Sequence, residues 1–287
     1  MPAERVLTQR DLNRAVLARQ RLLEPSTATI PRTLAAIGGL QAQYAPSMYV
    51  GLWSRMRGFE RDGLTRALER QHATITRKQL DELVGKQHAI GVGLWIDLVR
   101  APPAGTWERR RADVFAAAED WLGPPPAQLT PEDAAAQLVK RYLAGFGPAS
   151  RADIASYTQI AKRALAAVYE RLALRAFRSE HGDELLDVAR APLPDPATPA
   201  PVRFLPTWDA TLLVHARRAR ILPEQHRARI FGVRNPHSLP TFLVDGAVAG
   251  TWRHRDGEIE LEPFERLDAS TMRELRAEAE RLAAFHA

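Results

Sequence analysis

The sequence of 287 residues contains no cysteine. This excludes disulfide bonds, thiolate metal sites and cysteine nucleophiles, and it is typical of a cytoplasmic protein. The chain also lacks a run of about 18 apolar residues, which a membrane-spanning helix would need. Its first residues are charged and contain no apolar segment, so we expect no signal peptide. We therefore expect a cytoplasmic protein that makes no contact with a membrane.

The common sequence signatures of catalysis are missing as well. There is no Gly-x-Ser-x-Gly motif, no phosphate-binding Gly-x-x-x-x-Gly-Lys loop and no dinucleotide-binding glycine fingerprint. The eight histidines show no metal-ligand spacing, and His215 and His226 have no third candidate ligand nearby. We expect packing or surface histidines, no metal and no organic cofactor. His215 is kept as a residue that is either structural or part of a site.

The composition is that of a globular protein, with 45% hydrophobic and 26% charged residues. The formal net charge is +6, and most of the cations are arginines. A basic surplus suits a polyanion such as nucleic acid, because phosphate neutralisation releases counterions. A GC-rich genome, whose codons favour arginine and alanine, explains the same bias without any partner. Charge alone therefore does not decide the function.

A glutamine pair, Gln41 and Gln43, follows two glycines in the stretch LAAIGGLQAQY. The apolar residues of 34–40 have helical spacing, but residues two apart do not share a face of a regular helix. If both glutamines point into one groove, the backbone must leave the helix, and Gly38-Gly39 permits that break. A glutamine amide can hold a water by accepting and donating at once, although it cannot act as a base. The alternative is two surface glutamines on a helix.

We divide the chain into four parts with a mainly helical, α+β fold. Residues 1–71 form an N-terminal helical unit with the Gln-x-Gln motif, and 72–125 form a second unit with a hairpin around Pro-Pro-Ala-Gly. Residues 126–190 form a winged helix, and 191–287 a β-rich domain closed by a terminal helix. Asp245-Gly246 and Asp256-Gly257 read as hairpin turns in that domain.

The third unit is the clearest, with the pattern helix, helix, turn, helix and a two-stranded wing. Thr130 is a candidate helix cap, Ser150 and Asp153 are spaced as a capping box, and the hairpin turns at 181–183. The third helix carries Lys162 and Arg163 at its start, and we also assign to it Arg171 and Arg175. In helix-turn-helix proteins this helix enters the major groove. A winged helix can instead serve only as a protein-contact module or scaffold.

The run LAAIGGLQAQYAPSMYVGLWSR resembles the N-terminal motif of AlkZ/YcaQ-like DNA glycosylases, bacterial proteins with tandem winged helices. The resemblance continues through GLWIDLVRAPPAGTWERRRADVFAAAEDWLG, LVKRYLAGFGPASRADIASY and RFLPTWDATLLVHARRARILPEQHR to FLVDGAVAGTWR. In that family a Gln-x-Gln motif positions the water that hydrolyses N-glycosidic bonds of alkylated or crosslinked purines. The resemblance therefore implies that Gln41 and Gln43 are catalytic. It also implies a fold of tandem winged-helix units, with 1–71 as a winged-helix-like unit, 72–125 as a partial second unit and 126–190 as the third winged helix.

The chain departs from the family pattern after LTRALER, which Gln71-His72-Ala73 joins directly to TITRKQLDEL. We infer that an internal segment is missing, including the wing of the first unit. Three outcomes follow: a shortened domain that still folds, a dimer that covers the gap, or an inactive member. Asp209-Ala210 also departs, since many members carry Asn or Pro at the second position, so Asp209 is either structural or part of a site.

These observations favour a DNA-binding winged-helix protein, with hydrolysis of N-glycosidic bonds of alkylated purines as the implied reaction. The expected partner is double-stranded DNA, alkylated or crosslinked. We expect backbone contacts from Arg151, Lys162, Arg163, Arg253 and Arg255. The alternatives are a non-catalytic winged-helix DNA-binding or regulatory protein, and a protein-interaction scaffold whose basic surface reflects codon usage.

Overall fold

The computed structural model describes residues 5–42, 44–68, 75–84, 98–111, 113–123, 129–214, 219–231 and 238–287. Helices dominate, and three small sheets accompany them, which confirms the predicted mainly helical α+β class. The chain forms two compact units. The first contains residues 1–41, 50–57 and 130–287, and the second contains residues 42–49 and 58–129. The four-part division remains a prediction.

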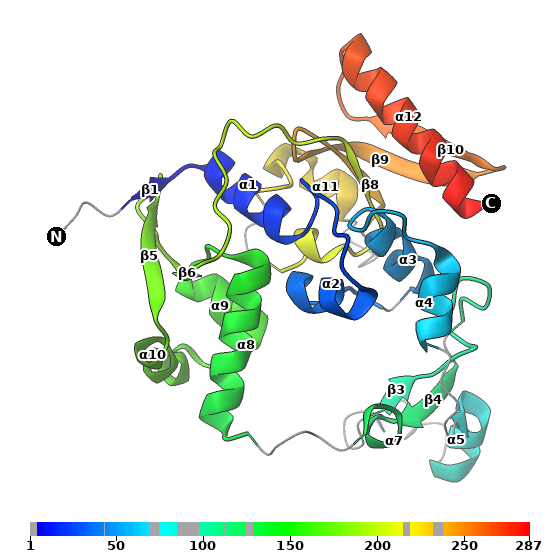
Figure 1. Cartoon of the computed structure of the whole chain (residues 1–287), viewed down its shortest axis with the longest axis horizontal. Helices are drawn as coiled ribbons and strands as arrows, with labels where there is room; N and C mark the ends of the chain where they lie inside the picture. The colour runs from blue at the N-terminus through cyan, green and yellow to red at the C-terminus, as the bar shows by residue number, and fades with distance from the viewer. Residues whose placement is uncertain are drawn as a thin grey trace. The chain divides into compact units, whose positions relative to one another are not determined.

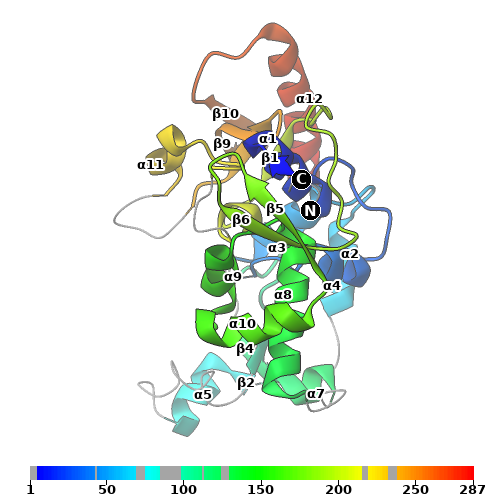
Figure 2. The ribbon, with the colours of Figure 1, turned by 90° about the vertical axis from the view of Figure 1, so that its left-hand side faces the viewer.

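In the first unit, residues 130–188 form a helical layer with a wing (Figure 2). Its helices are α8 (Pro131–Phe146), α9 (Arg151–Thr158) and α10 (Lys162–Arg171). Thr130 caps α8, and Ser150 with Asp153 forms the predicted capping box at α9. The wing consists of β5 (Leu174–Ser179) and β6 (Glu184–Val188), paired antiparallel. The helix–helix–helix–hairpin order follows the predicted winged-helix pattern.

An N-terminal segment completes this layer. β1 (Val6–Leu7) pairs parallel with β5, so the wing has three strands in the order β1-β5-β6. The helix α1 (Gln9–Arg19) follows, with a capping box between Thr8 and Asp11. α1 ends at Arg19, since Gln20 is its C-cap and Arg21 has a positive φ of 58°. The helix α2 (Ile30–Ile37) comes next.

The C-terminal part of the first unit is an antiparallel sheet with helices (Figure 1). Its strands are β7 (Arg203–Leu205), β8 (Thr241–Val244), β9 (Ala247–Arg255) and β10 (Glu258–Pro263), in the order β10-β9-β8-β7. Two-residue turns join the last three strands, and all four turn residues have positive φ, as the Asp-Gly pairs predicted. α12 (Ala269–His286) packs against β10, and α11 (Arg227–Ile230) is a short helix.

Segment 211–222, which we assigned to the β-rich part, contains no strand among its described residues. Ala210–Leu212 is a 3-10 turn, and Leu212, Ile221 and Leu222 are buried. They share a core with Val16 and Leu17 of α1. The apolar residues of this segment are therefore explained by packing against α1, not by the alternating pattern of a β-strand. The N-terminal helix thus supplies part of the core of the C-terminal sheet.

The second unit contains α4 (Arg61–Leu68), β2 (Ile75–Thr76), α5 (Arg77–Val84), β3 (Leu98–Arg100), β4 (Val114–Ala117) and α7 (Ala118–Leu122). The strands pair antiparallel in the order β2-β4-β3. The turn at 102–105 was predicted. The second strand of this hairpin was expected directly after the turn, but β4 begins only at Val114. The run 108–111 is instead an exposed loop, because its charged side chains are solvated and the next apolar strand begins at Val114.

Candidate active site

The backbone leaves the helix where the two glycines predicted. α2 ends at Ile37, and Gly38 and Gly39 have φ of 80° and 94°, in the left-handed region. The Gly39 amide donates to the carbonyl of Leu34 at 2.9 Å and closes the helix end. Residues 39–42 are irregular, and α3 (Ala45–Trp53) begins three residues later. The first glutamine therefore lies in a loop between two helices.

Gln41 is half-buried in this loop, and Gln43 lies outside the described residues. The preceding residue, Leu40, packs on Gly51 of α3, where a Cβ atom would lie 3.2 Å from the leucine side chain. On the other side, a Cβ atom on Gly38 would lie 3.1 Å from the ring of Phe146. The loop that carries Gln41 is thus packed against α3 at Leu40 and against α8 at Gly38.

The α3 helix is anchored in the first unit by a buried ion pair. The guanidinium of Arg55, just after α3, donates to the carboxylate of Asp209 at 2.7 Å, and both side chains are fully buried. Asp209 also caps the 3-10 turn by accepting from the amide and hydroxyl of Thr211. Asp209 thus connects the end of α3 to the 3-10 turn, and the choice between a structural and a site role for it stays a prediction. His215 lies outside the described residues.

The start of α3 belongs to the second unit. The ring of Tyr49 meets Trp107 edge-on at 5.5 Å, and its hydroxyl lies 2.9 Å from that of Thr65 on α4. A cavity of about 390 Å³ lies in the same unit. Among the described residues, its lining is largely aliphatic and comprises Ala42, Met48, Leu68, Val99, Arg100, Pro102, Ala104 and Gly105. Ala42 is the residue between the two glutamines of the motif.

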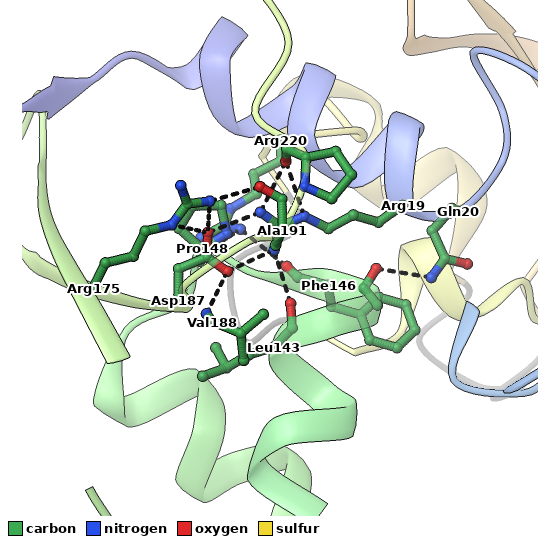
Figure 3. A network of polar contacts seen from close by, with 12 residues as sticks. Arg19, Gln20, Leu143, Phe146, Pro148, Arg175, Asp187, Val188, Ala191 and Arg220 are labelled. Atoms are coloured by element: carbon green, nitrogen blue, oxygen red, sulfur yellow. Dashed lines mark hydrogen bonds and ion pairs between the residues drawn. The ribbon is translucent and has the colours of Figure 1, made fainter. Parts of the chain in front are cut away.

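Buried side chains bind carbonyl groups at the end of α8 and just after it (Figure 3). Arg19, at the end of α1, donates to the carbonyl of Leu143 at 2.8 Å and to Asp187 at 2.9 Å with each of two nitrogens. Arg220 donates to the carbonyl of Pro148, two residues after the end of α8. Burial lowers the pKa of the Arg19 and Arg220 guanidinium groups, and Asp187 partly offsets this for Arg19.

Asp187 joins the wing to this network. It is fully buried on β6 and accepts from Arg175 at 2.7 Å as well as from Arg19. Arg175 lies on β5, not on the third helix where we had assigned it, because α10 ends at Arg171. Its side chain therefore points to Asp187 and to the carbonyl of Ala191. These contacts are internal and structural.

Of the predicted DNA-contacting residues in the winged helix, Arg151 is ion-paired. It donates to Glu184 at 2.6 Å and stacks over Tyr169, and this hydrogen bond raises the pKa of Arg151 and lowers that of Glu184. Lys162 and Arg163 are exposed at the start of α10, and within the described ranges they make no side-chain hydrogen bond or ion pair.

The two cations on β9 face a row of carboxylates on β10. Arg253 lies 3.9 Å from Glu260 and 3.8 Å from Glu262, and Arg255 lies 3.6 Å from Asp256 and 3.7 Å from Glu260. The five side chains are 47–92% exposed, and ion pairs between exposed side chains are weak and screened by salt. The hairpin face is nevertheless close to neutral, which the sequence positions alone did not show.

Within the described part of the chain, no group of three or more histidine, aspartate or glutamate side chains is arranged to hold a metal ion. No described helix is long and apolar enough to cross a membrane.

A family model described as DNA glycosylase AlkZ-like matches residues 34–77 and 72–285. The chain belongs to the AlkZ-like DNA glycosylase family. This confirms the family resemblance read from the sequence and, with it, the predicted class of DNA repair glycosylase. The two matched pieces meet at 72–77, where we inferred a missing segment, and that inference stays a prediction.

A solved structure, the Streptomyces sahachiroi DNA glycosylase AlkZ, matches this AlkZ-like chain with a TM-score of 0.78. The match covers 97% of each chain at 16% sequence identity. At 16% identity the match shows a similar fold. No curated protein matches the chain.

Proposed function

We propose that this AlkZ-like chain is a monofunctional DNA glycosylase that hydrolyses the N-glycosidic bond of alkylated purines in double-stranded DNA. The observation that carries the proposal is the loop of residues 38–42, which breaks the helix at two glycines and holds Gln41 outside it. Membership of a DNA glycosylase family supports the reaction class. A cytoplasmic location, where such an enzyme would meet the chromosome of a bacterium, is part of the proposal.

In the proposed reaction, the amides of Gln41 and Gln43 hold one water. The water donates a hydrogen bond to a side-chain carbonyl oxygen and accepts one from a side-chain NH2 group. The water oxygen attacks C1′ of the sugar. The C1′–N bond breaks, and its electron pair returns to the base. Because an N7-alkylated guanine is cationic, it leaves as a neutral base, and the attacking water loses its proton to solvent. Neither glutamine changes its protonation state.

DNA binding is part of the same proposal. Lys162 and Arg163 are exposed at the start of α10, the helix that enters the groove in helix-turn-helix proteins. We assign them phosphate contacts. Arg151, Arg253 and Arg255 would first have to exchange a carboxylate for a phosphate, and we give them a smaller share of the binding free energy.

The test is single-turnover excision of N7-methylguanine from an oligonucleotide duplex. The Gln41→Ala/Gln43→Ala variant should lose excision and keep duplex affinity. Gln137→Ala, which removes an exposed glutamine on α8, is the matched control and should excise normally. A wild-type protein that binds the duplex and releases no base would instead be a non-catalytic DNA-binding relative.

A further inference from the structure

The side chain of Gln20 fills the point where the ends of α1, α2 and α8 meet. It is fully buried. Its amide nitrogen donates to the carbonyl of Ile37, the last residue of α2, and to that of Gly145, near the end of α8, at 2.9 Å each. Both amide hydrogens are therefore used. The last four carbonyls of a helix have no partner within it, and one glutamine here satisfies two helices.

The two helix ends are also in close contact around this amide. A Cβ atom on Gly145 would lie 3.1 Å from the carbonyl oxygen of Ile37 and 3.5 Å from the amide nitrogen of Gln20. Gly38, the next residue of the chain, packs on the ring of Phe146. The end of α2 has little freedom to move relative to α8 while the Gln20 amide is in place.

The other half of the amide group is unusual. The side-chain oxygen of Gln20 is buried and has no hydrogen-bond partner within the described ranges. A buried acceptor without a partner is costly, so an apolar side chain would avoid that cost. What an apolar side chain could not provide is the pair of donors. The residue type at this position is therefore explained by the two carbonyl groups that it connects.

We propose that Gln20 is a positioning residue for the glycosylase reaction: it fixes the end of α2, and with it the loop that places Gln41. The inference rests on the proposed function only for its chemical consequence. Gln41 follows Ile37 by four residues, and the loop has no regular structure of its own. A shift of the helix end by 1 Å is carried into the glutamine, and misplacement of that size costs on the order of 100-fold in rate.

Two substitutions separate positioning from packing. Gln20→Met keeps the size of the side chain and removes both donors, so single-turnover excision should fall about 10- to 100-fold with duplex affinity unchanged. Gln20→Glu places a carboxylate against two carbonyl oxygens, so its rate should rise as the pH is lowered and the acid regains one hydrogen. The wild type should show no such step, and Gln137→Met is the control.

Hydrogen exchange tests the contact without the chemistry. The Gly39 amide, bonded to Leu34, should exchange faster in Gln20→Met than in the wild type. Unchanged exchange in Gln20→Met, or normal excision by it, overturns the role of Gln20. If the wild type releases no base, the proposed function fails, and the exchange experiment still decides whether Gln20 holds the loop.

Discussion

Removing the carboxylate of Asp187 should destabilise the protein strongly. Asp187 is fully buried and pairs with Arg19, which is also fully buried, and with Arg175, whose side chain is 31% exposed. In Asp187→Ala the Arg19 guanidinium stays in the interior without its counter-ion. Breaking one side of a buried pair costs about 3–5 kcal/mol, so we expect a loss of that size in the free energy of unfolding.

Substitutions of the two arginines that pair with Asp187 should change the free energy of unfolding by different amounts. Arg175→Ala leaves the Arg19–Asp187 pair intact and removes a partly exposed partner, so it should cost about 1 kcal/mol. Arg19→Met combined with Asp187→Ala should cost less than the sum of the two single changes, by about 1–3 kcal/mol. Urea unfolding followed by circular dichroism measures the free energy of unfolding of the wild type, the three single variants and the double variant. Equal losses for Asp187→Ala and Arg175→Ala, or strict additivity of the double change, would refute the account.

Three further outcomes are expected. Gly145→Ala puts a methyl group 3.1 Å from the carbonyl oxygen of Ile37 and should cost about 1–3 kcal/mol in thermal unfolding, with slower excision. In Lys162→Ala/Arg163→Ala, the slope of log K for duplex binding against log salt concentration should fall by the equivalent of up to about two phosphate contacts. Removing Arg253 and Arg255, the two carboxylate-paired arginines of β9, should change this slope less. Hydrogen bonds from the first turn of α12 hold the pKa of Asp268 well below its usual range, so its contribution to stability is complete above about pH 4 and is lost as the pH falls below that. The stability difference between wild type and Asp268→Asn should shrink from pH 6 to pH 2, and a constant difference would contradict the assignment.

The parts of the fold that were predictable are those that a few neighbouring residues determine. Gly38-Gly39 predicted the break in the helix because left-handed φ values are costly for other residues. Ser150 with Asp153 predicted a capping box, and Asp245-Gly246 predicted a hairpin turn. Each of these signals lies within four residues of the chain.

The parts that were missed depend on residues far apart in the sequence. Arg19 and Asp187 are 168 positions apart, and Gln20 meets Gly145 at a separation of 125. No local pattern specifies such a pair. The sequence did contain one indication of these contacts. Arg14 and Arg19 are in the same helix as the core residues Val16 and Leu17, and polar side chains that are buried beside such residues need hydrogen-bond partners inside the protein. Their partners could not be named from the sequence.

The contacts of α1 have a consequence for the order in which the chain can fold during synthesis. The carboxylate of Asp245 accepts from the buried Arg14, and the side chain of Asn13 donates to the carbonyl of Gly246 at 2.8 Å. These partners leave the ribosome more than 230 residues after Asn13 and Arg14. Leu12, on the same helix, packs on Phe177 and Leu185 of the wing, which emerge about 60 residues earlier than the β8–β9 turn. We therefore expect α1 to dock in two stages, with Leu12 covered first and Asn13, Arg14, Val16 and Leu17 covered only after the C-terminal sheet has been made.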